Sequence, residues 1–154
     1  METPSKIRLS YVMNAQKKSW RESMENLKRN AEHYPDPTAY KALRNLIGVK
    51  FSFMPLVYVC SPYAGDVDEN LERAKRYSRY VLDKGFIPIT PHLFLPQFMD
   101  DKTERNLAIF IDLVLLSKCA EVWVFGEQIS EGMEIEISYA NRKGKIVRYI
   151  KEVQ

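Results

Sequence analysis

A serine, a glycine and a glutamate with the spacing Ser-x-Gly-x-x-x-Glu are the residues of this sequence best suited to chemistry. They are Ser130, Gly132 and Glu136. If residues 130–142 form a helix, Glu136 lies one turn after Gly132 and one turn before Ala140, so these three share a face. The two small neighbours leave room around the carboxylate. Because burying a carboxylate on such a face costs free energy unless it has a partner, Glu136 is a candidate catalytic group.

The start of the same predicted helix is suited to an anion. Ser130 has the residue type of a helix N-cap, and Gly132 in the first turn allows a ligand to approach the backbone. The free amides and the positive end of a helix favour an anion such as phosphate. Ser130 is equally able to cap its helix without a ligand, and both interpretations stay open. Glu131 and Glu134 are expected to be solvated helix surface.

An isolated acid, Asp112, is a second candidate. It is the only acidic residue between Glu104 and Glu121, and the other residues from Ile109 to Leu115 are apolar. Asp112 is either the exposed position of a helix or a group of the site, and the pattern leaves both interpretations open.

Tyr58 and His92 are further candidates. Tyr58 lies in a short apolar segment, and His92 comes directly after Pro91. Tyr58 would belong to the first strand and His92 would lie just beyond the second, so both side chains point toward one crevice if these strands are neighbours. Each also has an ordinary structural interpretation, as a core tyrosine and as a histidine that packs a loop.

The elements that must position these residues alternate between strand and helix from residue 56 onward. This pattern predicts an α/β fold, a three-layer sandwich with a four- to five-stranded parallel sheet of the flavodoxin or Rossmann-like type, plus an N-terminal helical extension. Ligands of such sheets bind beyond the carboxyl ends of the strands, where the strand order changes direction. The loops expected there are 61–66, 91–96 and 126–132. The predicted strands are 56–60, 86–89, 120–125 and 145–150, and the predicted helices are 68–84, 103–117 and 130–142, with a proline-punctuated loop at 90–100.

Residues 1–54 differ from the α/β domain at 55–154 and are expected to be a helical N-terminal extension. The capping-box spacing from Ser19 to Glu22 predicts a helix start. A second helix is expected to begin at Asp36 and Pro37 and to end at Gly48. An apolar stripe on the first helix must pack against either the α/β domain or a second subunit, and is formed by Trp20, Met24, Leu27, Ala31 and Tyr34, before Pro35.

The composition narrows the class of protein. Of 154 residues, 45% are hydrophobic and 28% charged, which is usual for a soluble globular domain. The apolar runs are too short to cross a membrane, and the N-terminus lacks a signal-peptide pattern. Cys60 and Cys119 are expected to be reduced core residues of a cytoplasmic protein. With only two histidines, a structural metal site is improbable.

The net charge of +3 is uneven along the chain. Residues 1–54 carry ten Lys and Arg against five Asp and Glu. Such an arm could contact nucleic acid, but a solvated helix face explains it equally well, and no nucleic-acid motif accompanies the charge. We therefore expect no nucleic-acid partner.

Taken together, the motifs resemble the nucleoside 2-deoxyribosyltransferase-like superfamily, and its nucleotide N-glycosidase and uncharacterised phage and bacterial branches most closely. The resemblance runs from Val57 to Ile150. It rests on a tyrosine strand that leads into a small-residue loop at Val57–Gly65, on the pair Asp112-Leu113, on Ser130, Gly132 and Glu136, and on the continuation from Glu136 to Ala140.

The resemblance implies an enzyme that cleaves or transfers the N-glycosidic bond of a nucleoside or nucleoside 5′-monophosphate. Glu136 would attack the anomeric carbon, Tyr58 would orient Glu136, and Asp112 would handle a proton or a sugar hydroxyl. The residues implied in binding substrate or phosphate are Ser61, Gly65, His92, Ser130 and Gly132.

The resemblance implies no metal or redox cofactor, and it implies a homo-oligomer, a dimer or larger. The alternative function is a non-catalytic module that binds a nucleotide without cleaving it.

Overall fold

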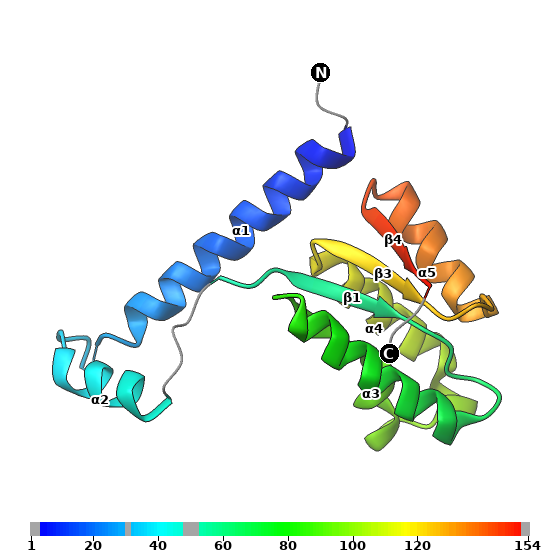
Figure 1. Ribbon diagram of the computed structural model, residues 1–154, viewed down its shortest axis with the longest axis horizontal. Coiled ribbons are helices and arrows are strands. Elements are labelled where there is room, and N and C mark those ends of the chain that lie inside the picture. The colour runs from blue at the N-terminus through cyan, green and yellow to red at the C-terminus, as the bar shows by residue number, and fades with distance from the viewer. Residues whose placement is uncertain (1–3, 30–31, 48–52, 152–154) are drawn as a thin grey trace. The chain divides into compact units, whose positions relative to one another are not determined.

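A computed structural model describes residues 4–29, 32–47 and 53–151 of the chain (Figure 1). The chain divides into two compact units. One comprises Met1–Val12 and Met54–Gln154, and the other comprises Met13–Phe53.

The larger unit is built on a four-stranded sheet, as the sequence predicted. The strands are β1 (Leu56–Cys60), β2 (Ile87–Ile89), β3 (Glu121–Phe125) and β4 (Ile146–Ile150). Their order is β2-β1-β3-β4, and every pairing is parallel. The connections between consecutive strands pass through helices, because parallel neighbours require a crossover.

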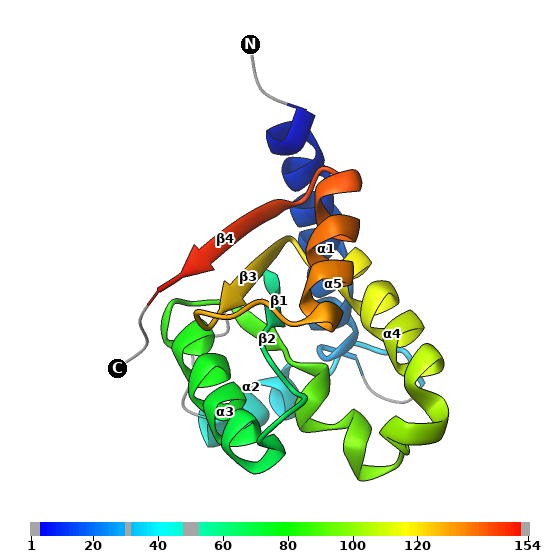
Figure 2. The same ribbon diagram turned by 90° about the vertical axis from the view of Figure 1, so that its right-hand side faces the viewer.

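Helices cover both faces of this sheet, which confirms the three-layer α/β sandwich. The helix α3 (Val67–Asp83) lies on one face, and α4 (Asp101–Lys118) and α5 (Glu131–Arg142) lie on the other (Figure 2). The predicted loop at 90–100 contains two short 3-10 helices, η1 (Pro91–Leu93) and η2 (Leu95–Gln97). Prolines stand near the start of both, where their fixed φ and missing N–H are tolerated.

The alternation of side chains along β1 separates two cores. Val57 and Val59 pack beneath α3 together with Trp123 and Phe125. Tyr58 points to the opposite face, where Leu116 of α4 and Met133 and Ala140 of α5 form the second core. This alternation sends the Tyr58 side chain toward α5.

Polar side chains mark where the three helices that cover the sheet, α3, α4 and α5, begin. Asp66, Asp100 and Ser130 are the N-caps of α3, α4 and α5, and each accepts a hydrogen bond from an amide of the first turn. The predicted bounds of these helices are therefore correct to within two residues.

The first helix of the chain was predicted wrongly. α1 spans Pro4–Asn26, so it begins well before Ser19, and Ser19 lies in its interior, where its carbonyl accepts a hydrogen bond from the Ser23 hydroxyl. The capping-box spacing arises by chance within a helix, and Pro4 holds the first position, which proline favours. The helix also ends before Leu27 and Tyr34, and Ala31 lies outside the described residues.

The second helix begins where it was expected. α2 spans Pro37–Ile47, with proline at its first position. The predicted end at Gly48 lies outside the described residues. Within the described ranges, no helix combines the length and the apolar character that a membrane crossing requires.

Candidate active site

The strand order creates a crevice at the carboxyl ends of the two central strands, β1 and β3. From β1 the chain moves outward to β2, then crosses back to β3 on the other side of β1. The connections therefore diverge between β1 and β3, and ligands of doubly wound sheets bind beyond the carboxyl ends of such strands. Ser61 follows β1 directly, and Ser130 ends the loop that follows β3.

A pocket of about 210 Å³ lies at this place. Its walls come from the β1–α3 loop, η1 and η2, α4 and the start of α5. Six of the eight residues that the sequence predicted for the site line the pocket, and they are Ser61, His92, Asp112, Ser130, Gly132 and Glu136.

Glu136 is held by a tyrosine beneath the pocket. The Tyr58 hydroxyl donates a hydrogen bond of 2.7 Å to Oε1 of Glu136. Tyr58 is fully buried and Glu136 is 5% exposed. Burial first, and then the negative charge of Glu136, raise the pKa of Tyr58 well above its usual value, so the tyrosine remains a neutral donor.

Glu136 lines the pocket, and its two carboxylate oxygens differ in their surroundings. Oε2 is buried and has no hydrogen-bond partner among the described residues. Burial raises the pKa of Glu136, while the Cys60 thiol and the Tyr58 hydroxyl oppose this rise because both stabilise the carboxylate.

Asp112 is buried in the same pocket, at 8% exposure, so the interpretation of a solvent-facing helix position is wrong. Its Oδ1 has no hydrogen-bond partner among the described residues. Burial, followed by the charge of Glu136, raises the pKa of Asp112 to about 8. Near neutral pH the raised pKa favours the acid form of Asp112, whereas the donors around Glu136 favour its charged form.

Ser61 contributes a third buried polar atom. Its Oγ has no hydrogen-bond partner in the described part of the chain, and the residue is 1% exposed. The three buried side-chain atoms that lack a partner there, on Ser61, Asp112 and Glu136, all line this one pocket. Buried polar groups are nearly always hydrogen-bonded in native proteins, so this concentration marks a site for a polar ligand.

His92 shapes the wall opposite α5. Its Nε2 lies 2.9 Å from the carbonyl oxygen of Ser61, and its ring stacks on Tyr63 with centroids 5.3 Å apart. His92 therefore packs the loop after β1, as its structural interpretation held, and it also presents a ring to the pocket.

One comparison with known proteins identifies the family. A family model described as a domain of unknown function, DUF7768, matches residues 55–150. The chain belongs to the DUF7768 family. The match spans all four strands, α3, α4 and α5, and thus every residue that lines the pocket. The comparison with curated proteins finds no match.

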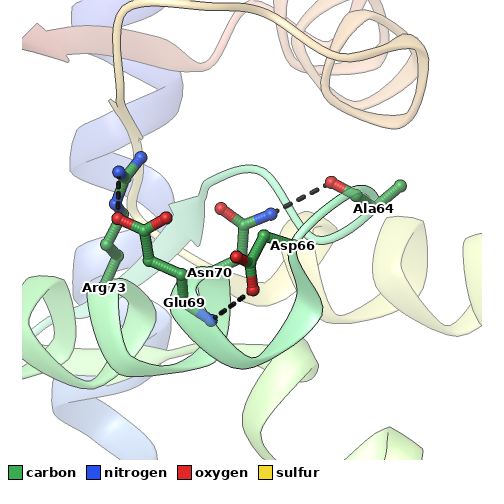
Figure 3. A network of polar contacts seen from close by, with 5 residues as sticks. All are labelled: Ala64, Asp66, Glu69, Asn70 and Arg73. Atoms are coloured by element: carbon green, nitrogen blue, oxygen red, sulfur yellow. Dashed lines mark hydrogen bonds and ion pairs between the residues drawn. The ribbon is translucent and has the colours of Figure 1, made fainter.

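Hydrogen bonds near the start of α3 hold the loop that follows β1 in the DUF7768 domain. Asp66 accepts a hydrogen bond from the backbone amide of Glu69 (Figure 3). The Asn70 amide donates to the carbonyl oxygens of Tyr63 and Ala64, at 3.2 and 3.0 Å. Because Tyr63 and Ala64 line the pocket, these contacts set the position of one wall.

Gly65, which was predicted to bind substrate, is not among the residues that line the pocket. Its φ of +96° is one that glycine adopts at little cost, and it lets the chain turn from β1 into α3. The structure therefore gives Gly65 a backbone role.

Replacing Asn70 with alanine is expected to loosen this wall. The change removes two hydrogen bonds to the loop, so the free energy of unfolding should fall by about 1–2 kcal/mol. Denaturant titration measures that loss, and amide exchange should become faster over residues 62–66. Asn141→Ala, at an exposed position of α5, is the control. Equal exchange in both variants would show that Asn70 does not hold the loop.

Two site residues of the DUF7768 domain were missed in the sequence. Arg105 lines the pocket from α4, seven positions before Asp112. That spacing of two helical turns places both on one face, and it could have revealed Arg105. Cys60 follows Tyr58 by two residues in β1, so the strand period puts it on the Glu136 side of the sheet.

In the part of the chain that the structure describes, no three His, Cys, Asp or Glu side chains gather in a group that could hold a metal ion. The pocket is lined by a carboxylate with one oxygen that has no partner among the described residues, by a carboxyl group whose raised pKa favours the acid form, and by polar groups at the start of α5. Such a set can form a covalent bond to carbon and supply a proton to a leaving group.

Proposed function

We propose that this DUF7768 protein cleaves or transfers the N-glycosidic bond of a nucleoside or a nucleoside 5′-monophosphate, with Glu136 as the nucleophile. The observation that carries the proposal is the buried hydrogen bond from Tyr58 to Glu136, which lines the same pocket as Asp112, whose raised pKa favours the acid form. The resemblance to the nucleoside 2-deoxyribosyltransferase-like superfamily supports it, because three of the four motifs on which it rests contribute distinct residues to this pocket.

In the first half of the reaction, Oε2 of Glu136 attacks the anomeric carbon C1′. The bond from C1′ to the base nitrogen breaks, and its electron pair stays with the base. Asp112 gives its proton to that leaving base, and an ester joins C1′ to Glu136. The positive charge that develops on the sugar is stabilised by the adjacent carboxylate.

In the second half, Asp112 acts as a base. It takes a proton from water, whose oxygen attacks C1′ and releases Glu136 and the free sugar. If a second nucleobase attacks in place of water, Asp112 takes its N–H proton, its nitrogen bonds to C1′, the ester bond to Glu136 breaks, and the reaction is a transfer.

Tyr58 leaves one oxygen of Glu136 free for attack by binding the other, and Tyr58→Phe should therefore slow the reaction. A hydrogen bond to a charged group contributes about 1.5–3 kcal/mol, so kcat should fall about 10- to 100-fold while KM changes little. Initial rates of base release measure both constants. Tyr149→Phe, at an exposed position of β4, is the control. If both variants keep the rate of the unmodified protein, Tyr58 does not position the nucleophile.

The proposed function is tested by incubating the full chain with a panel of nucleosides and nucleoside 5′-monophosphates. Chromatography detects free base, and addition of a second base detects transfer. Glu136→Ala is the inactive control. Calorimetry that shows tight binding of a nucleotide, together with no turnover of any substrate, would replace the enzyme with the binding module.

The partners and location of the protein remain part of the proposal. Cys60 and Cys119 are free and buried, which agrees with a reducing, cytoplasmic location. A homo-oligomer also stays a prediction, and exposed Leu107, Phe110 and Val114 on one side of α4 offer it an apolar surface. A small-molecule partner follows from the pocket proposed for the substrate, and the absence of a nucleic-acid partner stays a prediction.

A further inference from the structure

The outer part of the pocket holds an ion pair between two helices. Arg105 of α4 and Glu131 of α5 lie with Nη2 and Oε2 3.9 Å apart. Both line the pocket, and their side chains are 47% and 85% exposed. The pair therefore lies at the pocket's opening, whereas Asp112 and Glu136 are buried.

This ion pair is easily exchanged. Its separation is at the long end of ion-pair contact, and water screens both groups, so it contributes at most about 1 kcal/mol. Glu131 is the first residue of α5 and can turn its side chain into solvent. A ligand that carries a stronger anion can therefore take its place beside Arg105.

Among the described residues, Arg105 is the cationic side chain that the pocket offers to such an anion. Of the described residues that line the pocket, it is the only arginine or lysine. Asp100, an acid at the same opening, is engaged as the N-cap of α4, where it accepts a hydrogen bond from the Lys102 amide. A guanidinium presents several N–H groups in a plane, and this geometry suits the oxygens of a phosphate.

The groups around Arg105 complete an anion site. Ser130 and Gly132 line the pocket at the start of α5, where the helix carries partial positive charge. Independently of the helix, Ser61 offers a hydroxyl that is 1% exposed and has no partner among the described residues. The pocket thus combines the buried carboxyl groups of Asp112 and Glu136 with a guanidinium at its opening and with hydroxyl and amide donors.

We propose that Arg105 exchanges Glu131 for a phosphate group of the ligand, and so selects a nucleoside 5′-monophosphate over the free nucleoside. This selection rests on the proposed function, but the phosphate site itself does not. Glu131 is a competitor in this arrangement, because it occupies Arg105 until the ligand arrives. Removing its charge should therefore strengthen phosphate binding.

The first test measures inorganic phosphate binding to the full chain by calorimetry at constant ionic strength. Arg105→Gln should weaken phosphate about 10-fold or more, since a charge-assisted hydrogen bond is lost. Glu131→Gln should tighten it about 2- to 5-fold. The controls are Arg79→Gln on α3 and Glu134→Gln in the first turn of α5, both exposed and neither lining the pocket.

Two outcomes of this test overturn the phosphate site. One is that the unmodified protein does not bind phosphate, or that Arg105→Gln binds it within 2-fold of the unmodified protein. The other is that Glu131→Gln weakens phosphate binding, because the ion pair would then help to form the phosphate site and would not compete with the anion. If Glu134→Gln tightens phosphate binding as much as Glu131→Gln does, the exchange is also overturned. The change in affinity would then come from the overall charge of the helix and not from the ion pair with Arg105.

The second test compares kcat/KM for each 5′-monophosphate with kcat/KM for the matching nucleoside. Arg105→Gln should lower this ratio about 10-fold or more, whereas the control Arg79→Gln should leave the ratio unchanged. Turnover with an unchanged ratio leaves the proposed function standing and overturns selection by Arg105. Phosphate binding that follows the expected pattern, with no turnover of any substrate, retains the anion site and rejects the enzyme.

Discussion

Glu136→Gln is expected to abolish base release, with kcat at least about 10⁴-fold below that of the unmodified protein. Glutamine keeps the size of the side chain and an oxygen that can accept the hydrogen bond from Tyr58. It lacks the negative oxygen that would bond to C1′. The loss of rate therefore reports on the chemistry and not on a collapsed pocket.

The rate is measured under saturating substrate and again in a single turnover, so that a slow product release does not hide the chemical step. Glu134→Gln is the matched control, because it lies on the same helix at an exposed position. Circular dichroism and thermal melting establish that both variants fold. If Glu136→Gln retains more than about one hundredth of the rate, a carboxylate nucleophile at this position is excluded.

The fold was predictable because each strand has a simple pattern that the packing obeys. In β1, Leu56–Cys60 is a continuous apolar run, and its alternate side chains enter two cores beneath helices on opposite faces. Asp66 and Ser130 are effective N-caps, so the helix starts followed from residue type. The start of the N-terminal helix was predicted wrongly. The apolar pattern of this helix is weak, so the capping-box spacing was the leading indication of where it begins.

The site was only partly predictable, and Asp112 shows the reason. Its helix is apolar on more than one side, and Leu107, Phe110 and Val114 are exposed in the structure. Hydrophobicity along the helix therefore did not tell which face is buried. The distance between α4 and α5 could not be inferred from the sequence either. Arg105 and Glu131 meet only because these helices lie side by side, and local spacing carries no information about such a contact.

Asp112→Asn is expected to lower kcat/KM about 10²- to 10⁴-fold, the usual contribution of a general acid. Asparagine occupies nearly the same volume and removes the proton that the leaving base requires. The effect should depend on the base, because a good leaving group needs less help. A substrate with an activated leaving group should recover much of the lost rate in Asp112→Asn and almost none in Glu136→Gln.

The dependence on pH gives a second signature of Asp112. Burial and the charge of Glu136 raise the pKa of Asp112 to about 8, so the acid form prevails below that pH and is lost above it. For the unmodified protein, kcat/KM should fall as pH rises through about 8, and this alkaline limb should be absent in Asp112→Asn. A limb that persists in the variant would assign the titration to another group.

The same pKa shift makes Asp112 costly for stability. Its pKa is about 8 in the folded protein and near 3.8 in an unfolded chain, so the folded state binds the extra proton between these values. Stability should therefore decline as pH rises from about 4 to about 8 and then level off. Because asparagine does not titrate, Asp112→Asn should unfold at a higher temperature than the unmodified protein at pH 8, with the difference shrinking toward pH 4. Replacing a catalytic acid whose burial costs stability gives a protein that is slower and more stable. Replacing a carboxyl group that has a purely structural role would instead make the protein less stable.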